Sequence, residues 1–74
     1  MNQSFEARGV VKFYNPKKGY GFVILAQRDT GDAFLHRRCL AEIGRSDIDH
    51  GTEVVVRVEF QKHKPRVKQI VAVR

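Results

Sequence analysis

Residues 17–25 read KKGYGFVIL and predict a β-strand of unusual composition. Aromatic residues favour strands, but glycine weakens a strand interior because it loses the most backbone freedom and offers no side chain to pack. Gly19 follows a turn at residues 16–18, where we expect a positive φ angle. Gly21 lies beside Tyr20, and we expect it to let the strand coil and to leave the neighbouring ring open to a ligand. The composition therefore suggests that this strand does more than pack.

Strand patterns occur in four other segments. The clearest is VVVRVEF at residues 54–60, where alternate apolar residues are predicted to face the core, Phe60 among them. In RVKQIVAV, residues 66–73, the apolar residues change phase, which suggests a β-bulge. The other two segments are ARGVVKFYN at residues 7–15 and DAFLH at residues 32–36.

The connections between these strands include a hairpin loop and a helical segment. AQRDTG, residues 26–31, contains the glycine that a hairpin loop needs. Only RRCLAEIG, residues 37–44, has a helical pattern, because Leu40 and Ile43 lie three apart and Gly44 is suited to end a helix. Five short strands in 74 residues favour one all-β domain. A closed barrel is favoured at this size because closure removes exposed sheet edges.

Alternation along two of the predicted strands separates aliphatic residues from rings. Aliphatic side chains without polar atoms are the better core candidates, and they are Val23, Leu25, Ala33 and Leu35. The opposite face then carries Tyr20, Phe22, Phe34 and His36. Bases of single-stranded nucleic acid stack on exposed rings in a basic setting, so this face is predicted to bind such a strand.

Basic residues lie in two blocks along the chain. The net charge is +6, and residues 7–28 and 60–74 each contribute +5 without an acidic residue. Residues 29–59, between the blocks, carry a net charge of −3. This distribution favours one positive face and a polyanionic partner over charge that serves only solubility.

Other classes of function lack their signatures. With one cysteine, Cys39, and three scattered histidines, the sequence offers no internal disulfide and no spaced set of metal ligands. No apolar run approaches the roughly 18 residues of a membrane span, and no signal-peptide pattern follows the N-terminus. We therefore expect a cytoplasmic protein with no cofactor, no membrane association and no small-molecule substrate. A domain cut from a longer protein remains an alternative.

Two motifs resemble the bacterial cold-shock domain. GVVKFYNPKKGYGFV, residues 9–23, followed by DAFLH, residues 32–36, is similar to that family in order and spacing. KGYGFV, residues 18–23, resembles its first ribonucleoprotein motif, and AFLH, residues 33–36, resembles the core of its second. The resemblance extends from about residue 8 to residue 73.

The resemblance implies both a fold and an activity. The fold is a five-stranded antiparallel OB-type barrel in a single domain of residues 1–74, with its core at about residues 7–73 and one short helical turn near residues 37–43. The activity is binding of single-stranded RNA and DNA with low sequence specificity, as an RNA chaperone or a regulator of transcription or translation. We expect a monomer or a weak dimer.

The resemblance also implies a set of binding residues. Those lining the binding face are Lys12, Phe13, Tyr20, Phe22, Phe34 and His36. At its margin lie Tyr14, Asn15 and Lys18. Strict alternation from Val11 would instead bury Phe13 and expose Lys12 and Tyr14, so a bend or bulge in the first strand is needed to turn Phe13 outward.

This sequence departs from the family pattern at two of these positions. The family usually has tryptophan where this chain has Phe13, which implies a smaller stacking surface. It usually has an aromatic residue directly after the second-motif histidine, where this chain has Arg37. Arginine can stack on a base and also contact a phosphate, so we include Arg37 in the site and expect charge to contribute more of the binding. The basic segment QKHKPRVK, residues 61–68, is expected to widen the positive track.

Three alternatives to this interpretation are another RNA-binding fold, a protein-binding barrel and an enzyme. An RNA-recognition-motif domain also carries a pattern like KGYGFV, but only 17 residues precede Lys18 and none is helical, which excludes it. A barrel that offers its aromatic face to a protein or ribosomal partner remains open, since exposed apolar patches often mark such sites. Cys39 and His36 lie three apart, but nothing orients them as a nucleophilic pair and a small buried thiol is the simpler interpretation. We expect no enzyme and no catalytic residues.

Overall fold

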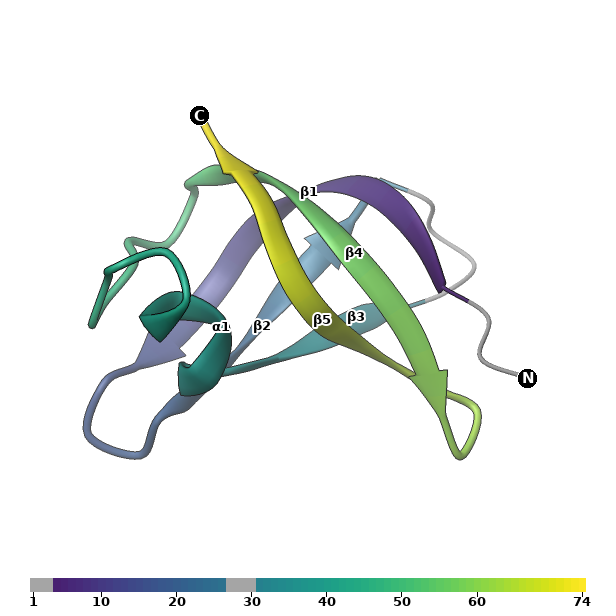
Figure 1. The fold of residues 1–74 in the computed structure, drawn as a ribbon, viewed down its shortest axis with the longest axis horizontal. Helices are drawn as coiled ribbons and strands as arrows, with labels where there is room; N and C mark the ends of the chain where they lie inside the picture. Colours follow the sequence, from purple (N-terminus) through teal and green to yellow (C-terminus); the bar gives the residue numbers. More distant parts are fainter. Residues whose placement is uncertain (1–3, 27–30) are drawn as a thin grey trace.

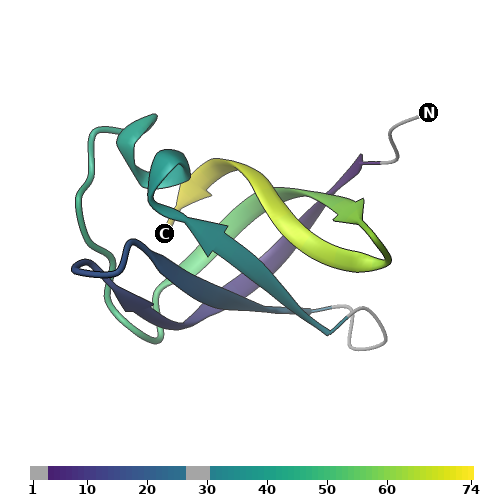
Figure 2. The same ribbon diagram turned by 90° about the horizontal axis from the view of Figure 1, so that it is seen from below.

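The computed structural model describes residues 4–26 and 31–74, which form five strands and one short helix (Figures 1 and 2). In chain order they are β1 (Ser4–Asn15), β2 (Tyr20–Leu25), β3 (Asp32–His36), α1 (Arg37–Ala41), β4 (Glu53–Gln61) and β5 (Lys64–Val73). The strands close into a barrel in the order β1-β2-β3-β5-β4. The predicted all-β barrel is confirmed. One pairing is not antiparallel, because β3 and β5 meet in parallel where Phe34 lies opposite Arg66.

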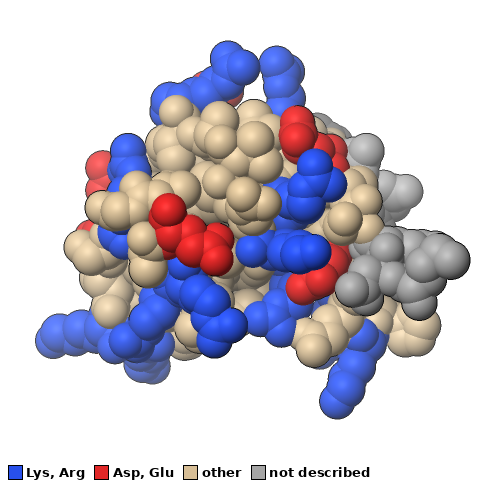
Figure 3. All heavy atoms as spheres, in the orientation of Figure 1, with Lys and Arg blue, Asp and Glu red and all other residues tan. Residues whose placement is uncertain are grey.

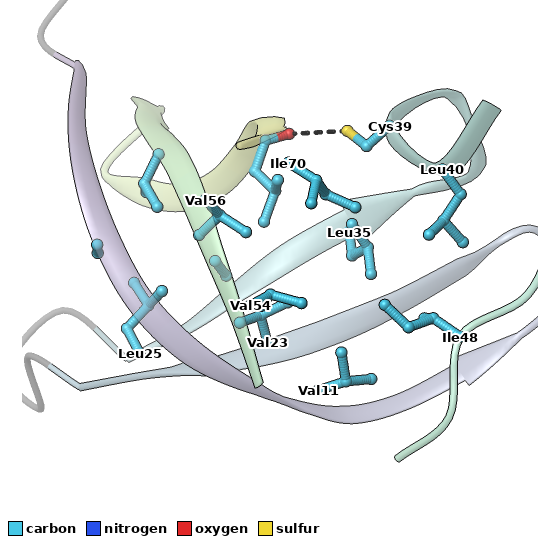
Figure 4. Close-up of a cluster of buried hydrophobic side chains, with 14 residues drawn as sticks. Val11, Val23, Leu25, Leu35, Cys39, Leu40, Ile48, Val54, Val56 and Ile70 are labelled. Carbon is cyan, nitrogen blue, oxygen red and sulfur yellow. Dashed lines mark hydrogen bonds between the residues drawn. The ribbon is translucent and has the colours of Figure 1, made fainter. Parts of the chain in front are cut away.

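Alternate strand residues point into the barrel and form an aliphatic core (Figure 4). The four residues predicted to be buried, each at most 3% exposed, are Val23, Leu25, Ala33 and Leu35. Others come from β1, β4, α1 and the segment before β4, and include Val11, Val54, Val56, Val58, Leu40 and Ile48. Full burial of a Val or Leu side chain contributes about 1.5–3 kcal/mol. The aliphatic residues therefore stabilise the barrel without any need for the rings of β2 and β3.

Bulges occur in both strands where the sequence suggested them. In β1, Val11 pairs with Val23 and Phe13 pairs with Phe22, so Lys12 is an extra residue without a partner on β2. In β5, the register skips Lys68 and Val71 in the same way. Each bulge reverses the facing of the residues that follow it. This reversal explains the change of phase in residues 66–73 and turns Phe13 outward, as the family resemblance required.

The exposure of Phe60 and the end of helix α1 differ from what the sequence predicted. Phe60 was predicted to face the core, but it is 43% exposed because it lies near the end of β4, beyond the last buried residue of that strand, and packs on Phe5 instead. Ile43, which was expected within the helix, lies beyond its end and is 37% exposed. Helix α1 ends at Ala41, earlier than expected, and the backbone then turns at Gly44 with a φ of 74°.

The start of β1 and the loop at residues 26–31 also differ from, or lie partly outside, what the structure describes. Strand β1 begins at Ser4, three residues earlier than predicted, because its first residues pair with Arg57–Glu59 of β4. Most of the hairpin loop predicted at residues 26–31 lies outside the described residues, which exclude 27–30 and with them Arg28 of the first basic block.

Gly21 allows two strands to approach closely and does not open the strand to a ligand. Its α-carbon faces the barrel and is buried. A side chain there would overlap the carbonyl oxygen of Phe13 and come within 2.8 Å of the Tyr14 α-carbon. The expectation that Gly21 gives access to the neighbouring ring is therefore wrong. The glycine is needed where β1 bends over β2 just after its bulge.

Candidate nucleic-acid interface

Five rings gather on the outer surface of β1, β2 and β3. Strand register places Tyr20 opposite His36 and Phe22 opposite Phe34. The bulge in β1 brings Phe13 opposite Phe22 on the same surface. Because every second residue of β2 and β3 enters the core, the intervening rings must point away from it. The outward orientation predicted from alternation is thus confirmed for β2 and β3.

The rings form a continuous cluster. Neighbouring ring centroids lie 5.7–6.3 Å apart from Phe13 through Tyr20, Phe22 and Phe34 to His36. Tyr20 and Phe34 are nearly parallel, at 21°, whereas the other pairs are tilted or edge-on. Phe13 is 40% exposed and the remaining four are half-buried because they cover one another. We call these five residues the aromatic platform.

Lys12, the bulged residue of β1, is held across the platform strands. Its ammonium group lies 3.0 Å from a carboxylate oxygen of Asp32 at the start of β3, so the side chain spans β2. The pair is largely exposed, and such pairs contribute little stability, typically about 0–1 kcal/mol. Lys12 is therefore positioned beside the rings by an interaction that a phosphate can replace at low cost.

Asn15, expected at the margin of the site, has a structural role in the β1–β2 turn. Its side-chain oxygen accepts hydrogen bonds from the backbone N–H groups of Lys17 and Lys18, at 3.0 and 3.1 Å. Its carbonyl oxygen accepts another from Gly19 N–H at 2.7 Å. An asparagine that folds the following residues into a turn in this way is common. The turn leaves the side chains of Lys17 and Lys18 exposed at one end of the platform.

Arg37 is docked on the same turn. Its N–H donates to the Gly19 carbonyl oxygen at 2.9 Å, and a Cβ at Gly19 would overlap its guanidinium group. Gly19 also has a φ of 78°, a conformation that favours glycine, as predicted. Gly19 is thus needed for its backbone angle and for the space that Arg37 occupies.

His36 joins the platform to helix α1. Its Nδ1 accepts a hydrogen bond from the Arg38 N–H at 3.1 Å, so the residue caps α1 and its ring orientation is fixed. This bond leaves Nε2–H as the donor of the neutral ring. The ring centroid lies 6.3 Å from that of Phe34. His36 can therefore offer both a ring face and a hydrogen-bond donor to a base.

Tyr14 does not join the platform. Its ring is half-buried and packs against the core, and its exposed part lines a separate hollow near α1. The structure thus brings together Phe13, Tyr20, Phe22, Phe34 and His36, with Lys12 and Arg37 beside them, but places Tyr14 and Asn15 in supporting positions.

Arg66 is a candidate site residue that the sequence did not single out. Its guanidinium carbon lies 5.9 Å from the centre of the Phe34 ring, within the range of a cation–π contact, and the group also donates to the side-chain oxygen of Gln61. Beside it is a hollow of about 400 Å³ lined by Phe34, Gln61, Lys62, Lys64, Pro65 and Arg66. The basic segment 61–68 was the available signal, but only the parallel pairing of β3 and β5 identifies which residue reaches the platform.

Basic side chains are not confined to one face. On the face with α1, β4 and β5 in front, Figure 3 shows Lys and Arg projecting near the β1–β2 turn and the β4–β5 turn, with Asp and Glu between them. The charge pattern along the sequence suggested a single positive face, which is too simple. In this view Lys and Arg lie at both turns and also between them, so positive charge is not confined to the turns.

Cys39 belongs to the core and not to a reactive pair (Figure 4). Its thiol donates a hydrogen bond to the Val67 carbonyl oxygen at 3.4 Å, and burial raises its pKa. A raised pKa keeps the thiol protonated and unreactive near neutral pH. Residues 4–26 and 31–74 contain no group of three potential metal ligands. In the same part of the chain, no helix is long and apolar enough to cross a bilayer.

Comparison with known proteins agrees with this arrangement. The family model described as the "Cold-shock" DNA-binding domain matches residues 7–73. The chain belongs to the cold-shock domain family. A cold shock-like protein, CspA, of Shewanella violacea is 42% identical over 69% of this chain and 71% of its own length. The cold shock-like protein CspA of Vibrio cholerae is 33% identical, with 86% and 90% covered, and cold shock protein CspC of Bacillus subtilis is 36% identical, with 70% and 76% covered. Membership supports nucleic-acid binding as the general activity of this cold-shock domain.

Proposed function

We propose that this cold-shock domain binds single-stranded RNA and DNA by stacking bases on the aromatic platform while lysines and arginines neutralise the phosphates. The observation that carries the proposal is a connected set of outward rings on a barrel whose core is complete without them. Base stacking on such rings contributes about 1–3 kcal/mol per base. Every base has a π-face, so the platform tolerates many sequences.

Basic groups supplement stacking at both ends of the platform. Lys17, Lys18 and Arg37 lie at the β1–β2 turn, and the hollow beside Phe34 contributes Lys62 and Lys64. These groups favour the strand through its phosphates, without regard to sequence. The resulting binder holds a strand unstacked and unpaired.

Such binding supports a role as an RNA chaperone. A domain that holds bases against its rings competes with the pairing of the same bases in a hairpin, and it needs no ATP. The same competition would regulate transcription or translation where a hairpin controls either process.

The proposal is tested by titrating the protein into fluorescently labelled oligo-dT and into a duplex of equal length, each at two salt concentrations. We expect tighter binding to the single strand and a linear fall of log affinity with log salt. Equal affinity for the duplex would overturn the proposal. An affinity that is indifferent to salt would instead favour a protein or ribosomal partner for the platform.

A further inference from the structure

We propose that this domain also binds the terminal phosphate of a nucleic-acid strand, in a hollow at one end of the aromatic platform. The hollow has a volume of about 220 Å³ and is lined by Tyr14, Pro16, Arg37, Ala41, Arg45 and Ser46. The inference rests on the proposed single-strand binding and adds an end-specific contact to it. Neither of the two binding motifs in the sequence includes Arg45 or Ser46.

The hollow adjoins the end of the platform. Strand register aligns Asn15 with Tyr20 and Tyr20 with His36, so these three residues form the last row of the face. The hollow is built from the immediate neighbours of that row, Tyr14 in β1 and Arg37 after β3. A strand whose last base stacks on Tyr20 or His36 therefore brings its terminal group to the hollow.

The lining of the hollow suits an anion. Its lining residues include two arginines, a tyrosine and a serine, and no acidic residue. Among the ion pairs of residues 4–26 and 31–74, neither Arg37 nor Arg45 has a carboxylate partner. The nearby acid Asp47 instead accepts a hydrogen bond from the Ile48 N–H at 2.8 Å. Guanidinium groups bind phosphate oxygens in pairs of parallel hydrogen bonds, which gives both strength and geometry.

A second hollow, around Cys39, provides a contrast. It contains Arg38, Arg66 and Lys68, but Glu42 and Glu59 also line it. The two carboxylates offset the cations there and oppose a bound phosphate. The hollow beside Phe34 is likewise lined by basic residues without an acid. What distinguishes the hollow at Tyr14 is its place next to the last row of the platform.

The charge of a terminal phosphate favours a strand end over an internal linkage in this hollow. The β1–β2 turn at Pro16 bounds one side and Ala41 of α1 another. An internal phosphate must have chain on both sides of it, whereas a terminal phosphate enters alone. A terminal monoester also carries about −1.5 to −2 charges at pH 7, against −1 for an internal diester.

The test compares three forms of one labelled oligo-dT: unphosphorylated, phosphorylated at the 5′ end, and phosphorylated at the 3′ end. Each is titrated into the wild-type domain, Arg45→Gln and Arg8→Gln. Arg8 is the charge-matched control, because it is exposed on β1 about 20 Å from Tyr14 along an extended strand. Circular dichroism and urea unfolding check that each variant folds.

We expect one of the two phosphorylated forms to bind the wild type about tenfold more tightly than the unphosphorylated form. That form also identifies the strand polarity on the platform. Arg45→Gln should remove most of this preference with little effect on the unphosphorylated strand, whereas Arg8→Gln should retain it. Equal binding of all three forms would refute the phosphate site and leave the proposed function standing. A preference that both variants reduce equally would show general charge attraction and also refute the site. If no form binds, the proposed function fails and the inference fails with it.

Discussion

Replacing Phe34 with alanine is the sharpest test of the aromatic platform. Phe34 lies at its centre, with ring centroids of Tyr20, Phe22 and His36 at 6.0, 5.7 and 6.3 Å and the Arg66 guanidinium carbon at 5.9 Å. The substitution removes one stacking surface, so we expect a loss of about 1–3 kcal/mol in binding free energy. At about 1.4 kcal/mol per tenfold, this is roughly a 5- to 150-fold rise in Kd.

The fold should survive this substitution. Phe34 is half-buried outside the core, so the cost to stability is the loss of ring pairs worth about 0.5–1.5 kcal/mol each, partly replaced by new contacts. A fully buried phenylalanine would cost about 3–5 kcal/mol. Ile70→Val is the matched control, because Ile70 is 3% exposed and its truncation should cost about 0.5–1.5 kcal/mol without touching the platform.

Urea unfolding measures stability, and fluorescence anisotropy with labelled oligo-dT measures affinity in conditions where each variant is folded. We expect Phe34→Ala and Ile70→Val to be destabilised to a similar extent, with a loss of affinity only for Phe34→Ala. The reasoning is refuted if Phe34→Ala unfolds the domain, or if the two variants bind equally well. Unfolding would place the ring in the core, and equal binding would show that the ring is not part of the site.

Three further predictions concern the close approach of β1 and β2, the arginine docked on the β1–β2 turn, and the core thiol. Gly21→Ala should unfold the domain or destabilise it by several kcal/mol, on the order of a severe core clash, because its Cβ would meet the Phe13 carbonyl oxygen. A urea midpoint equal to that of the wild type would contradict this prediction. Arg37→Phe should flatten the salt dependence of oligo-dT binding by about 0.7 in log–log slope, the value for one lost phosphate contact on a single strand. An unchanged slope would show that Arg37 contacts no phosphate. Because burial raises the pKa of Cys39, a smaller fraction is thiolate at pH 8 in the folded protein than in the unfolded chain, so a thiol reagent should label it slowly until urea unfolds the domain. Equally fast labelling with and without urea would show that the thiol is accessible.

The sequence predicted the parts of the fold that depend on strict alternation. Val23, Leu25, Ala33 and Leu35 were assigned to the core from parity alone, and all are buried, because a residue in a regular strand has only two faces to choose from. Alternation did not predict the exposure of Phe60, because burial near a strand end depends on where the neighbouring strands stop. Phe60 lies past Glu59, the last β4 residue that pairs with the described part of β1, and its side chain is 43% exposed.

The site was less predictable because it depends on contacts between distant segments. The facing of Phe13 followed from the family resemblance and not from alternation, since a bulge has no reliable signature in one strand. Arg66 could be noticed as part of a basic segment, but its place over Phe34 depends on the parallel seam between β3 and β5. The glycine at position 21 was explained by ligand access, whereas the cause is the backbone of β1, which lies eight residues earlier in the chain.

The two arginines beside the platform have different surroundings, and this difference assigns them different roles. The Arg66 guanidinium contacts the Phe34 ring and donates a hydrogen bond to Gln61, so it lies beside the platform. We therefore expect it to extend the stacking surface more than to bind a phosphate. Arg37 rests against Gly19 and, among the described residues, has no carboxylate partner, so its charge remains available to the strand. Stacking changes little with salt, whereas each phosphate contact adds to the salt dependence. We therefore expect an arginine at position 37, in place of the aromatic residue usual in the family, to shift part of the affinity from stacking to charge. The fold can accommodate this exchange because both arginines lie outside the aliphatic core.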